Sequence, residues 1–262
     1  MRPSPTPDAR DLLERNRRFY ELLWSGARLI EPQRFNTWSL VQSLAASGGR
    51  RLEVAPGLRP RLPIDGTQFV DISAAALEKL RRHGADVVLA EVTSLPFADA
   101  TFELVCALDI VEHVEDDERA LAELARVAKH GAVVLVSMPL DPALWTSFDE
   151  FVGHKRRYEP PALLAMLARH SLAVERSAVF GMKPRSSRLV DLGMWWLLHH
   201  RERAMWWYNR IFMRIGLWLQ KDLQLTRGMI ATAGVDEILL VCRRTATPSS
   251  AAVSAGGVGA SS

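Results

Sequence analysis

Short apolar runs, many of them rich in β-branched residues, recur along the chain and alternate with stretches of helical periodicity. Seven runs predict strands, at 51–55, 67–72, 86–90, 102–108, 131–138, 173–180 and 237–243. Apolar spacings of three and four predict helices between several of them, at 73–83, 116–129 and 160–170. Because strands alternate with helices, we expect βαβ units around a parallel sheet. The last two strands are the exception to this spacing.

The outer parts of the chain follow a different pattern. Residues 1–9 and 245–262 are small, polar or rich in Gly and Ser, so we expect both ends to be disordered. Residues 10–244 then form one domain. Helical spacing at 11–24 and 36–46 predicts a helical cap over 10–48, and a long insertion of about 183–228 separates the last two strands.

Composition excludes several classes of protein. The chain of 262 residues is 48% hydrophobic and 24% charged, as is ordinary for a globular protein, and its net charge of +3 is too small to indicate a nucleic-acid partner. Cys106 and Cys242 lie inside apolar runs without metal-ligand spacing, which favours two reduced thiols in a cytoplasmic protein. We therefore predict no metal site. The sequence shows no secretory signal and no run of 18 apolar residues.

Two acidic residues lie near the carboxyl ends of the first two predicted strands. Glu53 and Asp71 are 18 residues apart. In doubly wound folds ligands bind beyond these strand ends, and one carboxylate can accept hydrogen bonds from both hydroxyls of a ribose. Asp71 could instead cap the next helix, but Ser73 is available for that cap. We therefore favour a ribose-binding role for Asp71.

The loop after the first strand, Ala55-Pro-Gly-Leu-Arg-Pro60, retains a single glycine. It lacks the G-x-G-x-x-G fingerprint, which disfavours NAD and FAD. The crossover from Pro56 to Gly66 has eleven residues and two further prolines, too short and too proline-rich for a full helix. The helix N-terminus that would donate backbone N–H groups to an anion is therefore shortened or absent.

Residues 85–139 carry an ordered series of motifs: Glu91 four before Leu95-Pro96-Phe97, Asp99, Phe102–Leu104, Asp109–Val114, Glu123–Val127 and Gly131. In this order the motifs strongly resemble those of class I S-adenosylmethionine-dependent methyltransferases, and the resemblance covers about residues 50–180. The resemblance implies a Rossmann-like α/β fold, with a doubly wound, seven-stranded, mostly parallel sheet whose last strand is antiparallel. It also implies S-adenosyl-L-methionine as the cofactor.

The resemblance assigns roles around that cofactor. The family usually has an acid followed by G-x-G-x-G; Glu53 matches the acid, while Ala55 and Arg59 replace the outer glycines. The implied cofactor-binding residues are Glu53 (amino group), Ala55, Gly57 and Arg59 (loop by the methionine moiety), Asp71 (ribose), Ile72, Glu91 and Val92 (adenine), and Asp109 (methionine moiety and acceptor). We also hypothesise that Arg59 or Arg61 replaces the missing helix N-terminus as the partner of the cofactor carboxylate.

Methyl transfer depends largely on positioning, and a base is useful where the acceptor is a hydroxyl or an acidic carbon. The candidate catalytic residues are His113, His154 and Tyr158. The pattern His154-x-Arg156-x-Tyr158 resembles a segment of small-molecule methyltransferases. Purely structural roles stay open: a hydrogen bond beside Asp109 for His113, and pinning of a loop for the other two.

The insertion carries five of the eight tryptophans, and an apolar helical face is predicted at Ala204, Trp207, Tyr208, Ile211, Ile215 and Trp218. It is interpreted as a lid over the active site, as a homodimer contact through 186–221, or as a peripheral membrane contact.

The sequence thus favours methyl transfer to a small, hydrophobic acceptor. Ser137-Met138-Pro139 is unlike the D/N-P-P-Y/F motif of amino-directed DNA or protein methylation, which supports a small molecule. The alternative is a catalytically inactive methyltransferase-like module that serves as a partner subunit. An NAD-dependent oxidoreductase is disfavoured by the loop.

Overall fold

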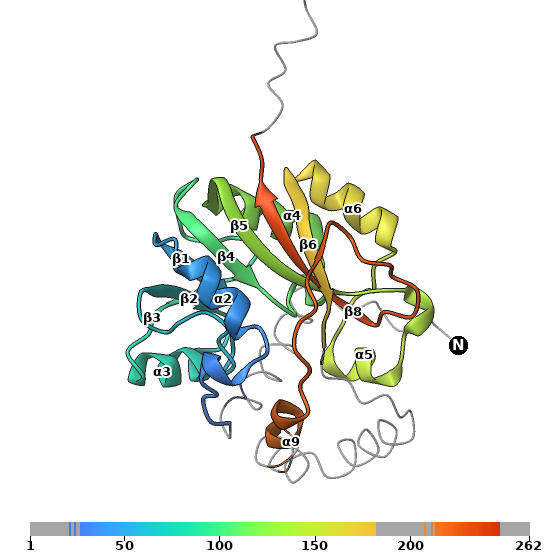
Figure 1. The fold of residues 1–262 in the computed structure, drawn as a ribbon. Helices are drawn as coiled ribbons and strands as arrows, with labels where there is room; N and C mark the ends of the chain where they lie inside the picture. The colour runs from blue at the N-terminus through green and yellow to red at the C-terminus, as the bar shows by residue number, and fades with distance from the viewer. Residues whose placement is uncertain are drawn as a thin grey trace, which may run out of the picture.

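The computed structural model describes residues 21, 24, 27–181, 207, 211 and 213–246. Within them one eight-stranded sheet has the order β3-β2-β1-β4-β5-β8-β6-β7 (Figure 1). The strands are β1 (Arg51–Val54), β2 (Thr67–Asp71), β3 (Asp86–Leu89), β4 (Phe102–Ala107), β5 (Ala128–Pro139), β6 (Leu172–Val179), β7 (Thr226–Arg227) and β8 (Glu237–Arg244).

The pairing confirms the predicted α/β fold with a mostly parallel sheet. β1 pairs in parallel with β2 and β4, β2 with β3, and β4 with β5. β8 is antiparallel to both β5 and β6, as expected for the last strand. The sheet has eight strands instead of the predicted seven, because the two-residue β7 adds to the edge of β6.

Three of the described helices match the predicted ones closely. The described helices are η1 (Pro32–Arg34), α2 (Trp38–Ala45), α3 (Ala74–Arg82), η2 (Val111–His113), α4 (Asp117–Val127), η3 (Pro142–Leu144), α5 (Ser147–Val152), α6 (Pro160–Arg169) and α9 (Met213–Trp218). Ser73 caps α3 by accepting a hydrogen bond from Ala76 N. No helix occurs over 55–66, which confirms that the crossover between β1 and β2 is too short for one.

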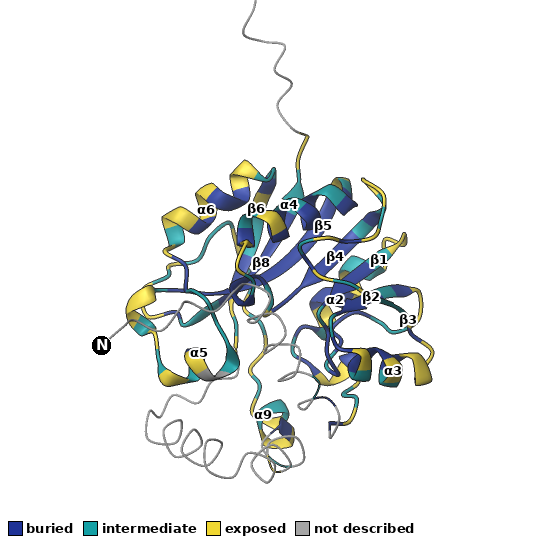
Figure 2. Cartoon of the chain, turned by 180° about the vertical axis from the view of Figure 1, so that it is seen from behind, coloured by how far each residue is buried: buried dark blue, intermediate teal, exposed yellow. Residues whose placement is uncertain are grey.

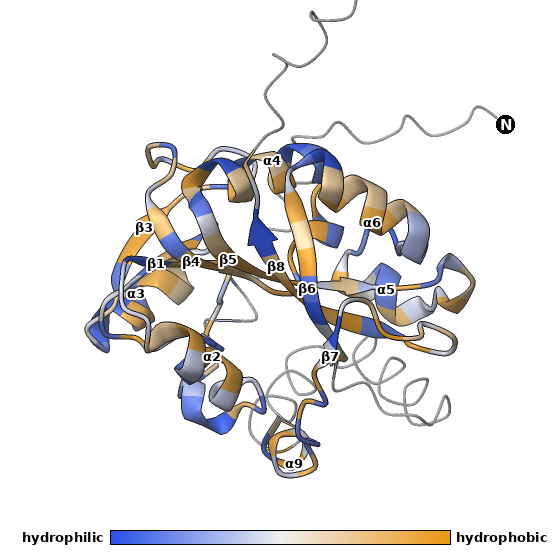
Figure 3. Cartoon of the chain, turned by 45° about the horizontal axis from the view of Figure 1, so that its top comes forward, coloured by the Kyte–Doolittle hydropathy of each residue, from blue (hydrophilic) through white to orange (hydrophobic). Residues whose placement is uncertain are grey.

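Helices cover both faces of the sheet, and the central strands are buried between them (Figure 2). Alternate residues of β4 face opposite layers: Val105 packs in the cluster with α4 and α6, whereas Leu104 and Cys106 pack in the cluster with α2. A third cluster joins α3 to Phe69 and Trp24. Figure 3 shows the resulting hydrophobic centre along β4, β5 and β8.

Parts of the predicted organisation lie outside the described residues. These parts are residues 1–9, most of the first cap helix, most of the insertion at 183–228, and residues 247–262. The second cap helix is α2, and the described end of the insertion contains α9. The segment after α9 is held beside η1, because Gln220 Nε2 donates to the carbonyl of Arg34 and Gln220 Oε1 accepts from Asn36 N. Among the described residues, no helix is both long and apolar enough to span a bilayer.

Candidate active site

Carboxylates gather where the central parallel strands end. Glu53 of β1 pairs in register with Phe69 of β2 and with Cys106 of β4. Asp71 is the last residue of β2, and Asp109 follows β4 by two residues. Because these strands are parallel, all three acidic residues lie toward the same edge of the sheet, where ligands of such folds bind.

The loop after β1 encloses the side chain of Glu53. Its Oε1 accepts a hydrogen bond from Arg61 N at 2.8 Å, and its Oε2 accepts one from Leu62 N at 2.8 Å. Burial raises the pKa of Glu53 to about 7, while the Leu62 and Arg61 backbone hydrogen bonds and the Arg61 charge act in the opposite direction. The two N–H groups therefore take the place of a helix N-terminus, but they serve a carboxylate of the protein itself.

Asp71 holds the same loop from the neighbouring strand. Its Oδ2 accepts from Gly57 N at 2.9 Å and its Oδ1 from Ser73 N at 2.8 Å. Burial raises the pKa of Asp71 to about 6 despite these hydrogen bonds. Each carboxylate oxygen has two lone pairs, so both oxygens retain capacity to accept a hydroxyl of a ligand.

The glycine-poor loop keeps a backbone that favours glycine. Ala55 has a φ of 57° and Gly57 a φ of 53°, both in the left-handed region. A Cβ atom on Gly57 would lie 2.1 Å from Cζ2 of Trp24. The buried Trp24 ring therefore packs directly on the loop, and the one remaining glycine is required by that contact as well as by its φ.

Two arginines follow in the loop and stack on aromatic rings. The guanidinium of Arg61 lies 3.9 Å from the centre of the Phe35 ring and 5.6 Å from that of Phe180, and Arg59 lies 5.3 Å from the Trp24 ring. Burial lowers the pKa of Arg61, whereas the charges of Asp109 and Glu53 raise it. Arg61 thus brings a buried positive charge toward the carboxylates at this edge.

Asp109 has a φ of 55° and is exposed as a residue, although the hydrogen bond at its carboxylate is partly buried. Its Oδ1 accepts a hydrogen bond from Ser137 Oγ, which in turn accepts from Asp109 N at 2.7 Å. Desolvation of the carboxylate acts to raise the pKa of Asp109, but a hydrogen bond from Glu237 and the charge of Arg61 lower the pKa overall. Asp109 is therefore an ionised carboxylate that a ligand can reach.

Glu237 and Ser137 were not predicted to lie at the site. Burial and the negative charge of Asp109 raise the pKa of Glu237 well above its usual value, so Glu237 is the protonated donor of the pair. The only sequence indication was a charged residue at the start of an apolar strand. Glu237 reaches this edge because β8 is antiparallel and pairs Glu237 with Pro139, at the carboxyl end of β5.

The residues expected to border an adenine follow the ends of β2 and β3. Ile72 is half-buried after Asp71, and Glu91 is exposed. Val92 is 4% exposed and packs in the main core cluster. The structure brings these residues to the same side of the sheet as Asp71, since β2 and β3 are parallel neighbours.

His113 and His154 lie together although 41 positions separate them. Their ring centres are 4.7 Å apart, edge to face. His154 Nδ1 lies 2.9 Å from Asp149 Oδ1. Burial lowers the pKa of His113 to about 3, and burial also lowers that of His154. Both imidazoles are therefore neutral near pH 7.

Tyr158 is placed differently. Its hydroxyl donates a hydrogen bond of 3.0 Å to Asp117 Oδ2, and Arg156 Nη1 binds the other oxygen of that carboxylate at 2.6 Å. Burial and the charge of Asp117 raise the pKa of Tyr158 well above its usual range. The hydroxyl is thus a donor that fixes the segment 156–158 against the start of α4.

A buried ion pair holds the histidine segment. Arg157 Nη2 lies 2.9 Å from Asp149 Oδ1, and Arg157 Nη1 donates to the carbonyl of Leu140 and to Asp236 Oδ1. These contacts hold the segment that carries His154 against the end of β5 and against the residue before β8. Arg157 itself is buried, with 7% of its surface exposed.

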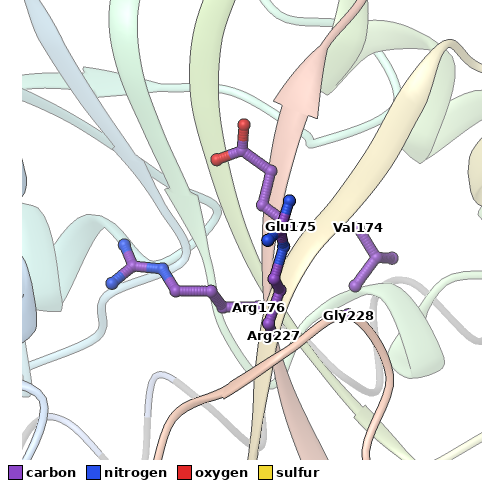
Figure 4. A pocket seen from close by; sticks show the side chains of 5 residues that line it. All are labelled: Val174, Glu175, Arg176, Arg227 and Gly228. Carbon is purple, nitrogen blue, oxygen red and sulfur yellow. The ribbon is translucent and has the colours of Figure 1, made fainter.

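A separate pocket of about 530 Å³ lies on β6 and β7 (Figure 4). It is lined by residues Val174, Glu175, Arg176, Arg227 and Gly228. It shares no residue with the carboxylate edge, and Glu175 is already paired with Arg243 at 2.8 Å. We therefore do not assign it to the active site.

Comparison with known proteins finds similarity to methyltransferases. Residues 67–136 match the family model described as "Methyltransferase domain". The chain is 29% identical over 122 residues to the uncharacterized methyltransferase YcgJ of Bacillus subtilis, covering 45% of this chain and 47% of the relative. It is 34% identical over 103 residues to a phosphatidylethanolamine N-methyltransferase of Cereibacter sphaeroides, covering 35% and 51%.

A third relative is the ubiquinone/menaquinone biosynthesis C-methyltransferase UbiE of Desulfotalea psychrophila, 27% identical over 160 residues, which cover 57% of this chain and 65% of the relative. The chain therefore spans between about half and two thirds of the length of these relatives. Among solved structures, an S-adenosylmethionine-dependent methyltransferase of Thermotoga maritima aligns with a TM-score of 0.55 and 17% identity, covering 90% of this chain and 97% of the other. This structural similarity supports a shared α/β fold for the two proteins.

Proposed function

We propose that this chain, which has a class I S-adenosylmethionine-dependent methyltransferase domain, transfers a methyl group to a small, hydrophobic acceptor. The observation that carries the proposal is the gathering of Glu53, Asp71 and Asp109 at the carboxyl edge of β1, β2 and β4. S-adenosylmethionine combines a ribose, an amino group, a carboxylate and a sulfonium. An edge with ionised and hydrogen-bonding carboxylates beside a buried arginine fits that set of groups.

The residues that would hold the cofactor follow from these contacts. Asp71 accepts the ribose hydroxyls through lone pairs that its backbone partners leave available. Asp109 faces the positively charged end of the cofactor. Arg61, whose charge interacts with those of Asp109 and Glu53, pairs with the carboxylate of the methionine moiety. The bound cofactor supplies an activated methyl group, so these residues act by orienting it.

On the acceptor side, His113 and His154 receive the polar group of the acceptor. Their pKa values are lowered by burial, so each imidazole is neutral near pH 7 and keeps a lone pair with which to accept a hydrogen bond from the acceptor or bind a cation. Tyr158 supports them as a positioning residue through its hydrogen bond to Asp117. Asp109, between the two sides, orients both reactants.

Two observations support a hydrophobic acceptor. Two of the relatives are named for phosphatidylethanolamine and for ubiquinone and menaquinone biosynthesis, which concern hydrophobic molecules. The described end of the insertion also exposes apolar surface, with Trp218 83% and Leu219 62% exposed. A helix of this kind suits a lid over an apolar acceptor, a subunit contact or a membrane surface.

The experiment is calorimetry of the full chain with S-adenosylmethionine and with S-adenosylhomocysteine, followed by an extract assay with methyl-labelled S-adenosylmethionine. We expect binding of both molecules and label in an organic-soluble compound. Absence of binding at millimolar concentration would overturn the proposal. Binding without labelling of any compound would favour the inactive module instead.

A further inference from the structure

Three side chains beside Asp109 form a compact set of metal-ligand groups. Glu112 and His113 lie on η2, and His154 reaches them from the segment after α5. Each offers one ligand atom, and the three atoms lie within 4.8 Å of one another. Glu112 Oε1 is 4.0 Å from His113 Nε2 and 3.8 Å from His154 Nε2.

The carboxylate of Glu112 is buried, and one of its two oxygens lacks a hydrogen bond. Glu112 is 2% exposed, and among the described residues its Oε2 has no hydrogen-bond partner. Buried polar atoms are normally satisfied, so an orphaned oxygen on a carboxylate that adjoins two imidazoles indicates a missing partner.

The hydrogen bonding of His154 leaves the required lone pair toward Glu112. Asp149 accepts hydrogen bonds from Thr146 N at 2.8 Å and from Arg157 Nε at 2.9 Å, so its carboxylate is an acceptor toward His154 as well. The proton of His154 is therefore on Nδ1, which donates to Asp149 Oδ1 at 2.9 Å. Nε2 then faces Glu112 with a lone pair. A carboxylate that orients a ligating histidine through its other nitrogen is a recurring feature of metal sites.

We propose that Glu112, His113 and His154 form a binding site for a divalent transition metal of the zinc class. Two imidazoles and a carboxylate suit zinc, whereas magnesium prefers a set of oxygen ligands. Ligand atoms around one tetrahedral zinc lie about 3.4 Å apart. The separations of 3.8 and 4.0 Å thus close with small side-chain rotations.

The metal would sit on the acceptor side of the proposed active site, since His113 follows Asp109 by four positions. Three protein ligands leave coordination positions for water or for a polar group of the acceptor. This inference revises the sequence-based expectation of no metal site. Only the role of the metal rests on the proposed function. Metal binding is measured without cofactor or acceptor, so the metal site can be refuted while the proposed function stands.

The test is a calorimetric titration of the full chain, free of any histidine tag and stripped with a chelator, with ZnCl₂ and separately with MgCl₂. We expect one zinc per chain and no comparable binding of magnesium. Glu112→Gln and His154→Asn should weaken zinc binding by about a hundredfold or more, since each removes a ligand. Glu115→Gln and His130→Asn, which change exposed residues outside the cluster, should bind like the wild type.

Co²⁺ absorption in the visible range then reports imidazole and carboxylate ligation directly. No stoichiometric zinc binding by the wild type would overturn the inference, and so would unchanged binding in both cluster variants. If circular dichroism shows that Glu112→Gln is unfolded, His154→Asn and the wild-type titration decide the question.

Discussion

The backbone N–H of Arg61 donates a hydrogen bond of 2.8 Å to the carboxylate of Glu53, which closes the loop after β1 onto the strand it has just left. Leu62 N adds a second hydrogen bond to the same carboxylate, and Asp71 fixes the middle of the loop through Gly57 N. The two acidic residues expected to meet a cofactor thus also shape the loop. Cofactor binding and folding of this loop therefore depend on the same side chains.

This arrangement predicts how stability depends on pH. The pKa of Glu53 rises on folding from 4.5 to about 7, so the folded state binds the extra proton and the free energy of unfolding falls as pH rises through that window. The effect is on the order of 3 kcal/mol, at about 1.4 kcal/mol per pKa unit. Asp71 acts in the same direction, with a pKa raised to about 6.

His113 acts in the opposite direction, because its pKa is lowered on folding from 6.5 to about 3. The quantity to measure is therefore the difference between wild type and Glu53→Gln in urea unfolding across this pH range. We expect the stability of the wild type to fall relative to that of the variant as pH rises. A constant difference would contradict the raised pKa of Glu53.

Ala55→Gly should stabilise the protein. Ala55 has a φ of 57°, a region that costs a residue with a Cβ roughly 1–2 kcal/mol. Glycine loses about 0.5–1 kcal/mol through its greater freedom in the unfolded chain. We expect a net gain of about 0.5–1 kcal/mol in chemical unfolding, whereas Ala165→Gly, on the exposed side of α6, should lose about 1 kcal/mol.

Gly57→Ala should destabilise the protein through a named contact. The new methyl group would lie 2.1 Å from Cζ2 of Trp24, and such overpacking costs roughly 1–3 kcal/mol. In a Trp24→Ala background the same change should cost less, because the ring is gone while the left-handed φ remains. Equal costs in both backgrounds would show that Trp24 does not constrain the loop.

Asp71→Asn should weaken cofactor binding. Loss of a charged acceptor for the ribose hydroxyls costs about 1.5–3 kcal/mol, or roughly a tenfold to hundredfold increase in Kd for S-adenosylhomocysteine. The control is Asp65→Asn, which changes an exposed carboxylate in the same crossover. The ribose assignment fails if the two variants bind alike while both remain folded.

Arg61 and Arg59 can be separated by conservative changes. Arg61→Lys keeps the charge but loses the planar group that stacks 3.9 Å from Phe35, so cofactor Kd should rise about tenfold. Arg59→Lys should have less effect, since Arg59 lies 5.3 Å from the Trp24 ring, whereas the charges of Asp109 and Glu53 act directly on Arg61. Unchanged affinity in Arg59→Ala and Arg61→Ala alike would exclude arginine as the substitute for the missing helix N-terminus.

The sequence predicted elements whose pattern is local. The apolar runs of β1 to β6 and β8 and the periodicity of α3, α4 and α6 were sufficient. Each of these elements except the partly exposed β3 buries a face, and only one period satisfies that burial. β7 was missed because it has two exposed residues, Thr226 and Arg227. α5 was also missed, although the capping box of Thr146 and Asp149 marks its start.

The site was predictable where residues follow strand ends and not where distant segments meet. Glu53, Asp71 and Asp109 could be grouped because parallel strands share an edge. The contact of Trp24 with Gly57, and the approach of Glu237 to Asp109, depend on tertiary packing across many residues. The orphaned oxygen of Glu112 is likewise a property of burial, which a sequence pattern cannot reveal.

The direction of β8 also determines where the chain can carry additions. Glu237 enters the sheet beside the active site, and Arg244 leaves it beyond Val133, at the opposite edge. A fluorophore or surface tether attached after Arg244 would therefore start at the opposite end of the strands from Asp109. Immobilised protein of this kind should bind cofactor and metal as free protein does, which makes β8 a natural route for attachment.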